Sequence, residues 1–180
     1  MTMFDRETAQ QDFFSLFDLP RRQALDANRL EAMYRDIQAK VHPDKHAHHS
    51  DAEKRLAMQW ATRVNEAYLT LKDPLRRARY LLELAGHDAQ LETNTAMPAG
   101  FLMAQMELRE AVVDAREAED AVALDEQHRR IRGEIRGAYG ELQEALDAGD
   151  YARAGGLVRQ LMFQEKLLHE IDDALALLEA

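Results

Sequence analysis

The chain has 180 residues and a net charge of −10, and 46% of its residues are hydrophobic while 31% are charged. This length suits one medium-sized domain or two small ones, and the scarcity of glycine and proline, 8 and 4 residues, favours an all-α fold. The absence of cysteine excludes disulfides, thiolate metal sites and a cysteine nucleophile.

The N-terminal segment and the length of the apolar runs indicate the cellular location of the protein. The opening residues MTMFDRETAQQDFF lack the apolar core of a secretion signal, and their acidic residues disfavour a transit peptide. No apolar run reaches the roughly 18 residues that a membrane-spanning helix needs. We therefore expect a cytoplasmic protein without a membrane partner.

Charge is distributed unevenly along the chain. Between Arg21 and Leu82 there are 13 Lys or Arg against 8 Asp or Glu, whereas Ala99 to Ala180 holds 9 against 18. Net charges of opposite sign indicate two modules that meet different partners, with chance composition on solvated surfaces as the alternative.

The first half of the chain predicts four helical segments, of which the first is short and covers residues 12–17. Asp26 caps the second segment, which must end near His42 because Pro43 disfavours helical backbone in the residue before it. Its apolar residues recur at helical spacing: Leu30, Met33, Tyr34, Ile37 and Val41.

The third segment begins at a capping box formed by Ser50 and Glu53. Its expected core face consists of Leu56, Trp60, Val64, Ala67, Tyr68 and Leu71. A short basic helix follows, with Asp73 as its cap, Pro74 at its first position and Gly86 after its end. Because the connection between the second and third segments is short, we expect them to form an antiparallel helical hairpin.

The second half predicts three longer helices. Residues 85–98 lack helical periodicity and gather Gly, Asn, Thr and Pro, so we interpret them as a linker between domains of residues 1–84 and 99–180. Helical segments follow at 98–120 and 121–148, and Gly149 and Asp150 separate the latter from a last helix. We expect these helices to form an antiparallel three-helix bundle.

The connection of the hairpin, HPDKHAHHSD from His42 to Asp51, holds four of the seven histidines. A metal site is disfavoured because Pro43 breaks the helix that would place His42 and His46 on one face, and no H-E-x-x-H motif is present. A hydrolase using His42 and Asp44 lacks a recognisable nucleophile. The sequence shows no recognition-helix or aromatic-platform pattern, so nucleic-acid binding is disfavoured. We expect no catalytic residue, metal, cofactor or nucleic-acid partner.

A protein-binding role fits the same connection. Pro43 fixes a backbone angle, and the Asp44 carboxylate is able to pair bidentately with an arginine. The preceding helix adds basic residues away from its apolar face, as a flank for an acidic partner: Arg29, Arg35 and Lys40. Polar tips are common on helical hairpins, so these features alone do not decide between a binding device and a plain turn.

His42-Pro43-Asp44, set between two amphipathic helices and followed by VNEAYLTLKDPLRRARYLL, resembles a J domain. The likeness runs from about Phe13 to Leu82 and includes the stretch Asn65 to Tyr68. It implies that the tripeptide and the basic helix before it dock on a DnaK-type chaperone and stimulate its ATP hydrolysis. By this likeness the chain is not itself the ATPase, and Asp44 is its least replaceable residue.

The helix of residues 98–120 has two apolar faces, although a three-helix bundle needs only one. We interpret one face as core: Phe101, Ala104, Leu108, Val112 and Ala115. A second apolar set shares its side of the helix with acidic residues: Leu102, Met103 and Met106 with Glu107, Glu110, Asp114 and Glu117. In the last helix Phe163 falls opposite the expected core residues, with Leu167 near it. A partner-binding patch and a structural contact explain this pattern equally well.

The stretches FLMAQMELRE and LVRQLMFQEKL resemble the HscB family of co-chaperones of iron–sulfur cluster assembly. The likeness implies an HscA-like chaperone as one partner and an IscU-like cluster scaffold protein as the other. It implies that the scaffold binds Leu102, Met103, Met106, Glu107, Glu110, Asp114 and Phe163. Met106 stands where the family commonly has Leu, and Asp114 where it has Glu. Two alternatives remain: a metal-dependent enzyme centred on the histidine-rich connection, and a general J protein that delivers unfolded clients.

Overall fold

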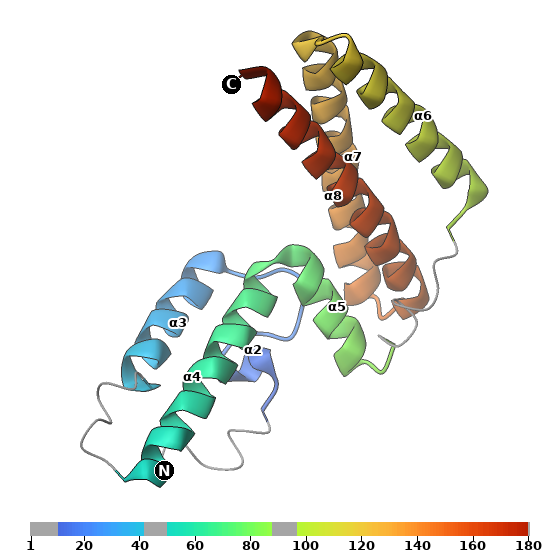
Figure 1. Cartoon of the computed structure of the whole chain (residues 1–180). Helices are drawn as coiled ribbons and strands as arrows, with labels where there is room; N and C mark the ends of the chain where they lie inside the picture. The colour runs from blue at the N-terminus through green and yellow to red at the C-terminus, as the bar shows by residue number, and fades with distance from the viewer. Residues whose placement is uncertain (1–10, 42–49, 88–96, 180) are drawn as a thin grey trace. The chain divides into compact units, whose positions relative to one another are not determined.

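The structure is a computed structural model that describes residues 11–41, 50–87 and 97–179. Within these ranges every regular element is a helix, which confirms the predicted all-α fold (Figure 1). The chain divides into two compact units, with the boundary between Leu81 and Leu82. The predicted linker of residues 85–98 lies largely outside the described residues, so its bounds stay a prediction.

The first unit contains helices α2 (Phe13–Leu16), α3 (Ala27–Val41), α4 (Asp51–Lys72) and most of α5 (Pro74–Leu84). Helices α3 and α4 lie side by side and antiparallel, which confirms the expected helical hairpin (Figure 1).

The predicted caps of these helices are confirmed. Asp26 Oδ1 accepts hydrogen bonds from the backbone N–H groups of the first turn of α3, at 3.0 and 3.1 Å. Ser50 and Glu53 form the reciprocal capping box at the start of α4. Asp73 Oδ1 accepts a hydrogen bond of 2.8 Å from the Arg76 backbone N–H. These caps satisfy backbone donors that a helix leaves unpaired at its start.

The core of the first unit corrects one predicted position. The buried side chains of α4 are Ala57, Trp60, Val64, Ala67, Tyr68 and Leu71. Leu56 was expected among them but is 37% exposed, whereas Ala57 is 1% exposed. At about 100° per residue, Ala57 falls nearer the centre of the buried face than Leu56 does.

Aromatic contacts fix the hairpin and its neighbours. The rings of Tyr34 in α3 and Tyr68 in α4 stack with 3.9 Å between their centroids. The Tyr68 hydroxyl donates a hydrogen bond of 2.8 Å to the Glu31 carboxylate in α3. At the other end of the unit, Phe13 in α2 stacks on Tyr80 in α5 with 4.6 Å between centroids. The first two contacts therefore hold α3 against α4, and the third holds α2 against α5.

The second unit contains α6 (Ala99–Glu117), α7 (Ala121–Asp147) and α8 (Tyr151–Glu179). They run antiparallel in sequence order, which confirms the predicted three-helix bundle (Figure 1). Gly149, at φ 71°, forms the turn between α7 and α8, where the left-handed backbone suits a residue without a side chain. Asp150 Oδ1 then accepts a hydrogen bond of 3.1 Å from the Arg153 backbone N–H.

The core of the second unit lies mainly between α7 and α8, and it corrects the prediction for Leu167. This side chain was expected beside an outward Phe163, but it is only 2% exposed. In this part of the bundle α8 has α6 as a second neighbour besides α7. The two helices are joined there by an ion pair of 3.0 Å between Arg109 in α6 and Glu170 in α8. Two neighbours bury a wider face of the helix than one does.

Candidate partner-binding surfaces

The first half of α6 contributes little to the core of its unit. The buried residues of this helix begin at Leu108 and continue with Val112 and Ala115. Phe101 and Ala104 were expected in the same core face, but Phe101 is half-buried and Ala104 is exposed. The reason is tertiary, because only the second half of α6 packs closely enough on its neighbours to exclude water.

An apolar patch results, formed by side chains of α6 and α8: Leu102, Met103, Met106 and Phe163. Their exposed fractions are 39%, 63%, 65% and 42%, although such side chains are commonly buried. The ring of Phe163 meets that of Phe101 edge to face, so α8 delivers Phe163 to the side of the first turn of α6. Met162, the neighbour of Phe163 in the sequence, is also 40% exposed. The sequence reasoning missed Met162, although its place next to Phe163 in a Leu-Met-Phe run is a signal for it.

Three carboxylates extend this surface along α6. Glu107, Glu110 and Asp114 are exposed, and none of them pairs with a basic side chain in the described part of the chain. Arg109, the basic residue among them, is already paired with Glu170. The negative charge of the three groups is therefore available to a basic partner.

The basic residues predicted on α3 are in a different state, because each already pairs with an acid of its own unit. Arg29 Nη2 lies 2.7 Å from Asp18 Oδ2, and Arg35 Nη2 lies 2.8 Å from Glu31 Oε1. Lys40 Nζ lies 2.5 Å from Asp36 Oδ2. These pairs are exposed, and exposed pairs are worth only about 0–1 kcal/mol, so a partner is able to displace them.

The tripeptide His42-Pro43-Asp44 lies outside the described residues. It falls in the connection between the end of α3 at Val41 and the start of α4 at Asp51. The Glu31 carboxylate belongs to the same hairpin, and its pKa is lowered by the hydrogen bond from the Tyr68 hydroxyl and by the one from Arg35. The ionised form of Glu31 thereby ties α3 to α4.

Other kinds of site find no support in the part of the chain that the structure describes. There, no group of three or more His, Asp or Glu side chains is arranged to hold a metal ion. The histidine-rich connection, residues 42–49, is not among the described residues. Across the helices described, none is both long and apolar enough to cross a bilayer.

Comparison with known proteins yields matches to both units. A DnaJ domain matches residues 12–80, and the HSCB C-terminal oligomerisation domain matches residues 97–172. The Co-chaperone protein HscB homolog of Aromatoleum aromaticum is 57% identical over 171 residues, which cover 94% of this chain and 97% of that protein. The structure of chaperone HscB from Vibrio cholerae matches with a TM-score of 0.85 and 35% identity, covering 93% of this chain and 99% of that one. Human co-chaperone protein HscB matches with a TM-score of 0.84 and 29% identity, covering 91% and 81%.

Proposed function

The chain belongs to the HscB family of J-domain co-chaperones, which act in iron–sulfur cluster assembly, and from this premise we propose the partners and surfaces that it uses. The apolar patch and its three carboxylates bind the IscU-like cluster scaffold protein. His42-Pro43-Asp44, with the basic residues of α3, docks on an HscA-like chaperone of the DnaK type and stimulates its ATP hydrolysis. The chain acts in the cytoplasm, as an activator of a partner's ATPase.

The observation that carries scaffold binding is the composition of the surface on α6 and α8. Four large apolar side chains are exposed beside three unpaired carboxylates, while the core face of α6 is a separate set of side chains that begins at Leu108. An apolar cluster with a polar rim is the usual anatomy of a protein interface. Methionine suits such a surface, because its flexible side chain adapts to the shape of a partner.

The charge of the surface predicts the chemistry of the scaffold's contact region. Glu107, Glu110 and Asp114 lie along α6 on the side of Met103 and Met106. A complementary partner therefore presents apolar side chains flanked by lysines or arginines. Complementary charges of this kind guide the encounter and fix the orientation of the complex.

The chaperone-binding side rests on the DnaJ match over residues 12–80 and on the tripeptide within it. Arg29, Arg35 and Lys40 add positive charge to the flank of α3, but each has an internal partner. We therefore assign them to the encounter with an acidic surface of the chaperone. The decisive contact is the Asp44 carboxylate.

Joining the two activities in one chain raises the effective concentration of scaffold at the chaperone. Once both are held, ATP hydrolysis converts the chaperone to its tightly binding state while its client is at hand. Tight binding of the scaffold then promotes release or transfer of the cluster, which is cargo of the scaffold.

The test is steady-state ATP hydrolysis by the HscA-like chaperone of the same organism. The chain and the scaffold protein are added separately and together, with the Asp44→Asn variant as the control. We expect stimulation by the chain, more stimulation with both proteins, and none with the variant. If the scaffold does not change the stimulation by the chain but denatured polypeptides increase it, the result would instead support a general J protein. No stimulation at all would refute the proposal.

A further inference from the structure

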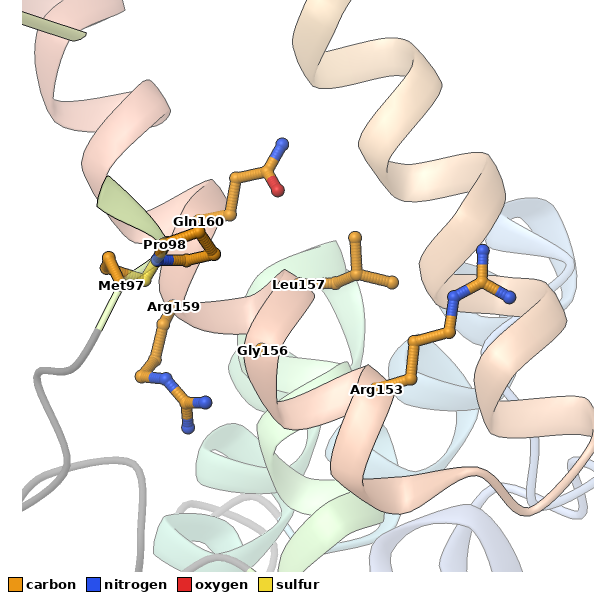
Figure 2. A pocket seen from close by; sticks show the side chains of 7 residues that line it. All are labelled: Met97, Pro98, Arg153, Gly156, Leu157, Arg159 and Gln160. Carbon is orange, nitrogen blue, oxygen red and sulfur yellow. The ribbon is translucent and has the colours of Figure 1, made fainter. Parts of the chain in front are cut away.

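A shallow groove of about 460 Å³ lies at the start of α6, within the second unit (Figure 2). Met97 and Pro98 form one side of it, and one face of α8 forms the other. The α8 residues that line it are Arg153, Gly156, Leu157, Arg159 and Gln160. The sequence predicted a binding role for none of these residues.

The groove adjoins the apolar patch along both helices. On α8, Arg159 precedes Phe163 by four residues, which places the two side chains one helical turn apart on the same face. On α6, the Leu102 backbone N–H donates a hydrogen bond of 3.1 Å to the Pro98 carbonyl oxygen, so these residues are also one turn apart. A partner seated on Leu102 and Phe163 therefore reaches the groove without a gap.

The two arginines of the groove differ in their charge partners. Arg153 Nη2 lies 2.9 Å from Glu141 Oε2 of α7, and Figure 2 shows its side chain extending toward that helix. Arg159 pairs with no carboxylate among the described residues. Its Nε is buried and has no hydrogen-bond partner there. A guanidinium in this state has hydrogen-bonding capacity left for a ligand.

The Arg159 guanidinium lies beside Gly156 of the same helix. Its Nη2 is 3.8 Å from the position that a Cβ atom on Gly156 would occupy, which is an ordinary contact distance. The start of α6 adds partial positive charge of the same sign, because Pro98 as N-cap offers no side-chain acceptor to the first turn. The groove is thus positively charged in a unit that carries excess negative charge.

We propose that this groove is the positively charged end of the scaffold-binding surface, and that Arg159 pairs with a carboxylate of the scaffold protein. The inference rests on the proposed function and adds the orientation in which the scaffold protein lies on the surface. Basic side chains of the scaffold lie over Glu107, Glu110 and Asp114, its apolar side chains lie over the patch, and its carboxylate lies one turn before Phe163. Arginine suits this role because its planar group binds a carboxylate through two parallel hydrogen bonds.

The test is calorimetric titration of the scaffold protein into four forms of the full chain: wild type, Arg159→Glu, Arg159→Lys and Arg136→Glu. Arg136 is exposed on α7 and does not line the groove, so its reversal changes the net charge equally. We expect Arg159→Glu to weaken scaffold binding about tenfold or more, because it places two carboxylates together. Arg159→Lys should lose less scaffold affinity than Arg159→Glu. The scaffold affinity of Arg136→Glu should stay within about twofold of that of the wild type. Stimulation of the chaperone without scaffold should be equal in all four. Equal unfolding temperatures report an intact second unit, which contains both substituted residues.

The failures of this inference and of the proposed function are distinguishable. If the wild type does not bind the scaffold, both are refuted. If Phe163→Ala weakens binding while Arg159→Glu binds as tightly as the wild type, only the role of the groove is refuted. Sedimentation of the chain alone provides the remaining check. Self-association that Arg159→Glu abolishes, with scaffold binding unchanged, would assign the groove to a second copy and overturn the inference.

Discussion

Phe101 in α6 and Phe163 in α8 meet edge to face, with 6.4 Å between ring centroids and an angle of 75° between ring planes. This contact joins two helices at the place where α6 otherwise has no buried side chain. Phe163 keeps 42% of its surface exposed, so one part of the ring is held by Phe101 while the rest is presented to solvent. The apolar patch is therefore built on a fixed ring.

We predict that Phe101→Ala weakens scaffold binding through Phe163. The lost edge contact is worth about 0.5–1.5 kcal/mol beyond the area it buries, so binding should fall about two- to tenfold. A double-mutant cycle with Phe163→Ala, measured by calorimetry, separates positioning from direct contact. If Phe101→Ala has the same effect in both backgrounds, Phe101 contacts the scaffold itself and the positioning role is wrong.

The second prediction separates the two activities of the chain. Leu102→Ala combined with Phe163→Ala should weaken scaffold binding about 1,000-fold, because anchor residues at interface centres commonly cost about 2 kcal/mol each and every 1.4 kcal/mol is about tenfold in affinity. Stimulation of the chaperone without scaffold should be unchanged. Leu177→Ala is the matched control, since Leu177 is a 75% exposed leucine of α8 outside the patch. An equal loss in this control would show a general effect on the bundle.

The converse variant is Asp44→Asn, which replaces the carboxylate of the tripeptide with an amide of the same shape. It should abolish ATPase stimulation, because the bidentate charged pair with an arginine of the chaperone is lost. Scaffold affinity should equal that of the wild type. Glu66→Gln, at an exposed position of α4, removes the same charge elsewhere and should stimulate normally. Retained stimulation by Asp44→Asn would remove the tripeptide from the mechanism.

Charge reversal on α6 should act mainly on the rate of association. Glu107→Lys with Glu110→Lys removes the unpaired acids that attract a basic partner, so the association rate constant for scaffold should fall about tenfold or more at low salt. The difference from the wild type should shrink as salt is raised, because exposed charges are screened. Stopped-flow measurements check this, with Glu144→Lys on α7 as the exposed control. A defect that is independent of salt would contradict the electrostatic role.

The last prediction concerns pH and the hairpin. The Tyr68 hydroxyl and Arg35 lower the pKa of Glu31 from 4.5, so ionised Glu31 stabilises the fold above that pH, and this contribution is lost as pH falls through the lowered pKa. Tyr68→Phe removes the larger of these influences. Its urea midpoint should lie below that of the wild type at pH 7, and the difference should narrow below pH 4.5. A difference that widens on acidification would contradict this assignment.

The helices and their ends could be predicted from the sequence because their signals are local. Asp26, Ser50 with Glu53, Asp73 and Asp150 each cap a helix within a few residues of their own position. The side of a helix that faces water was predictable where one neighbour defines it. That side was not predictable where a helix diverges from its neighbours, as α6 does at Ala104. Nor was it predictable where a helix has a second neighbouring helix, as α8 does at Leu167.

The candidate surfaces, too, could be predicted from the sequence only in part. The exposed apolar residues of α6 could be expected because they break the single face that a bundle needs. The internal partners of Arg29, Arg35 and Lys40, and the lack of one at Arg159, depend on side-chain positions that periodicity does not report.

The internal ion pairs of α3 have a consequence for turnover. If the chaperone docks on α3 as proposed, it gains a contact with each base only by displacing the acid that already pairs with that base: Asp18, Glu31 or Asp36. The net gain per contact is small, and the acids return as soon as the chaperone departs. Such a surface favours short-lived encounters, which let one copy of this chain serve many chaperone molecules in succession.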